Sequence, residues 1–204
     1  MLKGILKQKH KKNIFDTFET LLIASATCAF IYITIAIPNK VEGQSMEPNF
    51  EHRDLVITNK TIQYLGATDF GRDQNYDYKR GDVVIVKQEK VDIIKRIIAL
   101  EGEKVEIKNN NVYIDGKELN EEYLPTTTRT KLPTKEDALF SPGEIIEVPS
   151  NSYFVMGDNR EHSKDSRYKD VGFVRREEIK GEVVFRYWPP TRFGIIHTGE
   201  YSIT

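Results

Sequence analysis

The segment VDIIKRIIAL, residues 91–100, is rich in branched aliphatic residues, which favour strands over helices. Alternate side chains of a strand share one face, and the face that contains Lys95 consists of Val91, Ile93, Lys95, Ile97 and Ala99. Lys95 is its one polar member. Burial lowers the pKa of an amine, and a neutral amine can act as a general base. The alternative interpretation is an edge-strand lysine whose ammonium group reaches water.

Similar β-branched runs follow one another along the rest of the chain. They cover residues 54–58, 82–87, 105–108, 112–114, 145–148, 153–156 and 182–187. Asn109–Asn111 and Asp115–Gly116 stand between such runs and are typical of tight hairpin turns. The polar, turn-rich stretch 60–80 predicts a surface loop. The fold class is therefore predicted to be mainly β, with antiparallel strands.

A membrane-type segment precedes these runs. The 18 residues from Thr20 to Ile37, TLLIASATCAFIYITIAI, carry no charge. A helix of that length covers roughly 27 Å, close to the bilayer core of about 30 Å. Asp16 and Glu19 are expected at the helix N-terminus, and Pro38 is expected to end the helix. A cleaved signal peptide and a buried helix are the alternatives.

The charge distribution predicts how this segment is oriented. Residues 1–12 contain five lysines and no acid, which predicts that the N-terminus stays in the cytoplasm. We therefore predict a cytoplasmic N-terminus over 1–17, a transmembrane anchor over 18–37 and an extracytoplasmic domain over 38–204. About 104–150 would form a β-rich excursion within that domain.

Composition excludes several classes of protein. Mean hydropathy is −0.50, which excludes a multi-span membrane protein. Without the five N-terminal lysines the chain has 25 basic and 31 acidic residues, and this balance of −6 argues against nucleic-acid binding by the domain. Cys28 is the single cysteine, and the four histidines are scattered, so we predict neither a metal site nor a cofactor.

Two polar motifs stand out beside the strands. Residues 43–48 read GQSMEP, and residues 157–167 read GDNREHSKDSR. Taken alone, Ser45 in a Gly/Pro-flanked turn is an ordinary turn residue, and the second motif is an ordinary rigid polar loop. Taken together with Lys95 they indicate more, because a nucleophilic serine without a histidine needs another base, and a buried lysine can serve.

The combination resembles bacterial type I signal peptidases, which are membrane-anchored serine proteases with a Ser/Lys dyad. The single N-terminal span resembles their short subtype. The segments that carry the resemblance are Gly43–Pro48, Arg80–Val84, Ile94–Ile98 and Gly157–Arg167. The last of them reads G-D-N-R-x-x-S-x-D-S-R at every specified position.

The resemblance implies a role for each matching residue. Ser45 would be the nucleophile and Lys95 the general base. Ser163 would hydrogen-bond to Lys95 and orient it. Met46 and Pro48 would shape the turn and the substrate cleft.

The resemblance also implies two ion pairs. Asp165 and Arg167 would hold the 157–167 loop in place. Arg96 would pair with an acid of the same loop, and Asp158 is the expected partner.

The family's substrates are preproteins with small residues at positions −1 and −3 from the cut, and the lipid bilayer would be the second partner. Two other functions remain open at this point. One is a self-cleaving repressor-type Ser/Lys enzyme, although such enzymes carry a helix-turn-helix domain where this chain has a membrane-type segment. The other is a membrane-tethered module that binds preproteins without cutting them.

Overall fold

The protein is built mainly from antiparallel β-strands, as the sequence predicts. The computed structural model describes residues 2–66, 68, 70, 71, 74, 76–88, 91–199 and 201–203. The strands are β1 Ala36–Lys40, β2 Leu55–Asn59, β3 Val83–Val86, β4 Ile93–Ala99, β5 Lys104–Lys108, β6 Asn111–Ile114, β7 Lys117–Glu121, β8 Ile145–Glu147, β9 Ser152–Met156, β10 Val174–Arg175, β11 Ile179–Trp188, β12 Gly194–Ile195 and β13 Tyr201–Ile203. The helices are α1 Leu2–Thr34, α2 Thr61–Leu65, and the 3-10 turns η1 Arg176–Glu178 and η2 Pro190–Arg192. The chain divides into two compact units, residues 1–37 and 38–204.

Helix α1 is the one helix among the described residues that is long and apolar enough to cross a membrane, over Phe15–Tyr32. It differs from the prediction at both ends. It begins at Leu2, so Asp16 and Glu19 lie within it and not at its N-terminus. It ends at Thr34, four residues before Pro38, because β-branched residues are poor helix formers and a residue that precedes proline favours the extended conformation.

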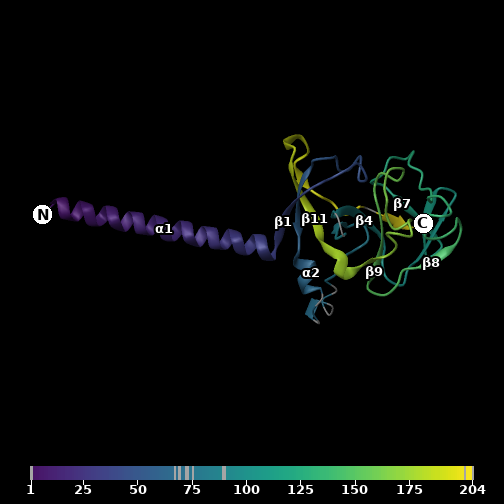
Figure 1. Ribbon diagram of the computed structural model, residues 1–204, viewed down its shortest axis with the longest axis horizontal. Coiled ribbons are helices and arrows are strands. Elements are labelled where there is room, and N and C mark those ends of the chain that lie inside the picture. The colour runs from purple at the N-terminus through teal and green to yellow at the C-terminus, as the bar shows by residue number, and fades with distance from the viewer. Residues whose placement is uncertain are drawn as a thin grey trace. The chain divides into compact units, whose positions relative to one another are not determined.

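The larger sheet contains the elements that carry the sequence motifs. Its strand order is β1-β2-β11-β3-β4-β9-β10, with β12 added to β11. In Figure 1, β11 lies on one side of β4 and β9, and β7 and β8 lie on the other. β4, which contains Lys95, is therefore an inner strand, hydrogen-bonded to β3 and β9.

Both faces of the inner strands β3, β4 and β9 are buried. Ile97 packs with Val84 and Val155 on one side of the sheet, whereas Ile94 packs with Val83 on the other. A sheet covered on both faces shows continuous hydrophobic runs. Lys95 is thus enclosed by its strand neighbours and does not sit on an edge.

The smaller sheet has the order β13-β7-β6-β5-β8. Two tight turns connect β5, β6 and β7, and both residues of each turn have positive φ: 51° and 65° at Asn109 and Asn110, and 52° and 80° at Asp115 and Gly116. These angles are typical of type I′ hairpin turns, as the Asn and Asp-Gly signals predict. The last strand of this sheet, β13, comes from the C-terminal end of the chain.

The stretch 60–80 is more than the surface loop that its polarity suggests. It contains α2, whose Ile62 is buried, and Tyr78, which is 3% exposed. Both side chains belong to the hydrophobic cluster that includes Ile97 and Val155. Two apolar residues in a polar stretch are enough to dock it on the sheet, because each buried side chain contributes about 2 kcal/mol.

Candidate active site

Ser45 and Lys95 meet directly. The Nζ atom of Lys95 donates to Ser45 Oγ over 2.8 Å and to the carbonyl of Ile94 over 2.8 Å. Ser45 comes from the turn between β1 and β2, and Lys95 comes from the middle of β4. Lys95 is 2% exposed. A nucleophile within hydrogen-bond reach of a base is the arrangement that nucleophilic catalysis requires.

Burial changes the proton affinity of the Lys95 amine. Loss of hydration lowers its pKa from 10.5 to about 8. The negative charges of Asp165 and Asp158 act in the opposite direction, and the charge of Arg167 adds to the lowering. At a pH near 8, about half of the Lys95 side chains are therefore neutral and able to accept a proton.

Buried anchors hold the turn of Ser45 in place. Met46 and Phe50 are each 1% exposed and pack with Val56 and Val83. The apolar side chain of Met46 fills the core beneath the turn and so shapes the turn from its buried side, and its part in the substrate cleft stays a prediction. Pro48 is exposed, and its carbonyl accepts a hydrogen bond from Arg192 over 3.1 Å.

The 157–167 loop is stiffened by an ion pair inside it. Arg167 donates from Nε to Asp165 Oδ1 over 2.8 Å and from Nη2 to Oδ2 over 2.9 Å. The backbone N–H of Gly157 also donates to Asp165, over 3.0 Å. Burial by itself would raise the pKa of Asp165, but the hydrogen bonds and the charge of Arg167 outweigh burial and keep that pKa below 3.8. The carboxylate therefore stays ionised and keeps the loop closed.

Ser163 lies in this loop, but the predicted hydrogen bond between its hydroxyl and Lys95 is not formed. Its side chain is 3% exposed, and its hydroxyl makes no hydrogen bond of ordinary geometry with the described residues. The second hydrogen bond of the Lys95 amine goes to the carbonyl of Ile94. Ser163 is nevertheless close to the turn of Ser45, because its Oγ and the Ser45 carbonyl lie on the same side of Gly157.

Gly157 allows the loop to approach Ser45 closely. A Cβ atom at this position would lie 2.2 Å from Ser163 Oγ and 2.3 Å from the carbonyl oxygen of Ser45. Asn159 then secures the contact. Its backbone N–H donates to the Ser45 carbonyl over 3.1 Å, and its side chain donates to the carbonyl of Gln44 over 3.1 Å.

The structure also brings together Arg96 and Asp158. The guanidinium donates to Asp158 through Nε over 2.8 Å and through Nη2 over 2.6 Å, and through Nη1 to the carbonyl of Gly81 over 2.9 Å. Both side chains are buried. Asp158 accepts a further bond from Asn49 over 2.9 Å, so this pair ties β4 to the loop and to the turn of Ser45.

Sequence reasoning missed two supporting contacts. Arg160, inside the motif, forms a two-pronged ion pair with Glu121 of β7 and donates from Nε to the carbonyl of Gly157 over 3.1 Å. Asn49 links Asp158 to the carbonyl of Tyr123. The partners come from segments with no local pattern of their own, and only the fold brings them to the loop.

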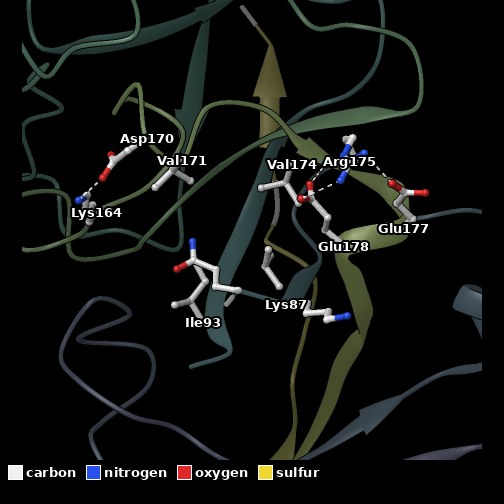
Figure 2. A pocket seen from close by; sticks show the side chains of 11 residues that line it. Lys87, Ile93, Lys164, Asp170, Val171, Val174, Arg175, Glu177 and Glu178 are labelled. Carbon is white, nitrogen blue, oxygen red and sulfur yellow. Dashed lines mark hydrogen bonds and ion pairs between the residues drawn. The ribbon is translucent and has the colours of Figure 1, made fainter. Parts of the chain in front are cut away.

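A hollow of about 930 Å³ lies beside Ile93 of β4, and neither Ser45 nor Lys95 is among the residues that line it (Figure 2). Its apolar wall includes Ile93, which precedes Lys95 by two residues and lies on the same face of β4. Figure 2 shows Lys164 paired with Asp170 on one side of it and Arg175 paired with acidic side chains on the other. Among the residues that the structure describes, no His, Cys, Asp and Glu side chains group as they would around a metal ion.

Known proteins that are similar to this chain come from one family. The model of the family described as "Signal peptidase, peptidase S26" matches residues 14–188, which include Ser45, Lys95 and the 157–167 loop. Signal peptidase I S of Bacillus subtilis (strain 168) is 35% identical over 179 residues, covering 88% of this chain and 91% of that protein. Signal peptidase I P of Bacillus subtilis subsp. natto is 36% identical over 186 residues, covering 88% and 93%. A crystal structure of a signal peptidase I from Enterococcus faecalis V583 matches 52% of this chain and 96% of that chain, at 31% identity and a TM-score of 0.41.

Proposed function

Because this chain belongs to the type I signal peptidases of peptidase family S26, we propose that Ser45 and Lys95 are the nucleophile and the general base of its endopeptidase reaction. The observation that carries the proposal is the 2.8 Å contact between Lys95 Nζ and Ser45 Oγ. The amine is buried, so its neutral form is accessible near neutral pH.

The first half of the reaction forms an acyl-enzyme. The neutral Lys95 amine takes the hydroxyl proton of Ser45 while Oγ attacks the scissile carbonyl carbon. The tetrahedral intermediate collapses, the C–N bond breaks, and the ammonium of Lys95 gives its proton to the leaving amine. The backbone N–H of Ser45 is the proposed donor to the oxyanion.

The second half releases the cleaved signal peptide. Lys95, neutral again, takes a proton from water, and the hydroxide attacks the ester carbonyl. The ester bond to Oγ breaks, and the proton returns to Ser45. No group beyond the dyad and one water is needed for the proton balance.

Supporting residues keep this geometry fixed. Arg167 and Asp165 stiffen the loop, and the pair of Arg96 with Asp158 fastens it to β4. Ser163 is proposed as a loop residue that packs against Gly157. Reactive groups must be held to within about 0.5 Å of the productive geometry, and buried two-pronged pairs provide that rigidity.

We propose that the substrate binds as an extended chain, with its backbone along a strand and alternate side chains in small sites. Small sites reject large residues by steric clash, which accounts for small residues at −1 and −3. The hollow beside Ile93 (Figure 2) is available to a part of such a chain.

The apolar part of α1, Phe15–Tyr32, is the proposed membrane anchor. The lysines of residues 1–12 favour a cytoplasmic N-terminus, so residues 38–204 would lie outside the cytoplasm. An anchor in the same bilayer as the apolar part of a preprotein raises the effective concentration of enzyme and substrate.

The full chain in detergent micelles, incubated with a purified preprotein, tests the function. We expect the parent to make one cut after the small-residue motif. Ser45→Ala is expected to abolish this cut. The control Ser141→Ala, at an exposed serine, is expected to cut at the parent rate. Binding of the preprotein without any cut would instead favour the non-cleaving binding module. Cleavage by Ser45→Ala at the parent rate would remove Ser45 from the mechanism.

A further inference from the structure

The C-terminal segment, residues 194–199 and 201–203, follows the part of the chain that the family model matches, which ends at residue 188. It joins the two sheets. β12 pairs with β11, with Ile195 opposite Phe185. β13 pairs with β7, with Tyr201 opposite Glu121.

Between these strands the segment passes over Gly81. Gly199 donates its N–H to the Gly81 carbonyl over 3.3 Å, and the same oxygen accepts Arg96 Nη1 over 2.9 Å. The approach is so close that a Cβ atom on Gly81 would lie 2.6 Å from the ring of Tyr201. The C-terminal segment and the guanidinium of Arg96 therefore share one anchoring point.

A stack of side chains makes a second connection. The ring of Tyr201 meets the ring of Tyr123 edge to face, with centroids 5.5 Å apart and planes at 70°. The guanidinium carbon of Arg96 lies 4.1 Å from the centroid of Tyr123. Aromatic edge contacts and cation–π contacts of this geometry are both stabilising.

Hydrogen bonds connect this stack to Ser45. Arg96 holds Asp158, and the next residue, Asn159, holds the carbonyl of Ser45. We propose that Tyr201 is a positioning residue, which acts through Tyr123 and Arg96 to keep Ser45 aligned with Lys95. The inference rests on the proposed function of the dyad and assigns a role to a segment outside the matched part of the family.

Variants at Tyr201 test this on the full chain with a preprotein substrate. Tyr201→Ala removes the ring and is expected to lower kcat about tenfold with little change in KM, because misplaced reacting groups slow chemistry more than binding. Tyr201→Phe keeps the ring and is expected to restore kcat, because the ring makes the edge-to-face contact with Tyr123. Tyr64→Ala, on the half-exposed helix α2, is the matched control and keeps the parent kcat.

Two further measurements separate positioning from general loss of structure. Rates are taken per folded molecule, well below the melting temperature of every variant, and Tyr201→Leu replaces Tyr201→Ala if the latter does not fold. In a double-mutant cycle with Tyr123→Leu, Tyr201→Ala is expected to lower kcat little further. The reason is that Tyr201 acts on Arg96 through the ring of Tyr123, so the two losses are not additive.

Parent kcat in both Tyr201→Ala and Tyr201→Leu would overturn the inference, and so would fully additive losses in the cycle. Both results count only if the parent protein cleaves the preprotein and Ser45→Ala does not. Absence of Ser45-dependent cleavage in the parent would instead contradict the proposed function.

Discussion

Lys95 Nζ lies 2.8 Å from Ser45 Oγ although the two residues are 50 positions apart in the chain. Neither residue reaches the other by local structure. β4 carries the amine into the interior, and the turn after β1, anchored by Met46 and Phe50, carries the hydroxyl to it. The contact is therefore a product of the tertiary fold.

Burial explains why Lys95 can be neutral, and the carboxylates near it are already paired with arginines. Three arginines of the site each hold a carboxylate in a buried, two-pronged pair: Arg96 with Asp158, Arg160 with Glu121, and Arg167 with Asp165. Within the described part of the chain, no carboxylate lies within salt-bridge distance of Lys95. A buried cation without a counter-ion is unstable, so the amine loses its proton more easily than in water.

Replacement of Lys95 by arginine is expected to abolish cleavage. Guanidinium stays protonated at every working pH and cannot accept the Ser45 proton. Rates of preprotein cleavage by Lys95→Arg and Lys95→Ala should both fall to the level of Ser45→Ala. The exposed Lys117→Arg serves as the matched control. Turnover by Lys95→Arg at a tenth of the parent rate or more would contradict the role of a deprotonated amine.

Replacement of Lys95 by methionine is expected to stabilise the protein at neutral pH and below. The folded-state pKa of Lys95 is depressed from 10.5 to about 8, so the unfolded chain binds more protons between those values and the stability of the parent rises with pH across that window. Lys95→Met lacks this dependence. Compared with the parent, Lys95→Met should gain about 3 kcal/mol more in free energy of unfolding well below pH 8 than above pH 10.5.

Urea unfolding of parent and Lys95→Met at a series of pH values measures that difference. The difference should be constant below pH 7 and shrink as the pH rises through 8. A difference that does not vary with pH would contradict a lowered pKa for Lys95.

Substitution of Gly157 by alanine is expected to damage the site more than the fold. The new methyl group would lie 2.2 Å from Ser163 Oγ and 2.3 Å from the Ser45 carbonyl, so the loop must move away from Ser45. A displacement of about 1 Å costs on the order of 100-fold in rate. Gly194→Ala is the control, because a methyl there meets no atom within 4 Å. Equal cleavage rates for the two variants would contradict the close approach.

Loss of the Asp158 charge is expected to destabilise the folded protein strongly. Asp158→Asn leaves the buried guanidinium of Arg96 without its counter-ion, which costs about 3–5 kcal/mol. Glu177→Gln, at an exposed pair with Arg175, is the control and should leave urea unfolding unchanged. A midpoint for Asp158→Asn equal to that of Glu177→Gln would show that the buried pair is dispensable.

Much of the site could be predicted from sequence because its residues lie in dense local motifs. The stretch 157–167 contains Asp158, Ser163, Asp165 and Arg167 within eleven positions, and the aliphatic run around Lys95 indicates a buried strand. The partners that lie outside these motifs could not be found in this way. Glu121 and Asn49 have ordinary local surroundings, and their importance arises from long-range pairing with Arg160 and Asp158.

Single side chains decide where a segment packs. Met46 follows Ser45 in the sequence, and its side chain is held in the core, since an unbranched side chain of that size fills gaps well. The polarity of the stretch 60–80 predicts a surface loop, but Ile62 and Tyr78 dock it on the sheet. Composition averages over a segment, whereas docking depends on one or two side chains.

The pH dependence of kcat/KM for preprotein cleavage tests the central claim most directly, because it reports the ionisation of essential groups in the free enzyme. We predict that kcat/KM rises with pH along a limb with an apparent pKa of about 8, and that Ser45→Ala shows no cleavage at any pH. A limb near 10.5, the value for an exposed lysine, would contradict a buried, neutral Lys95 as the base for Ser45.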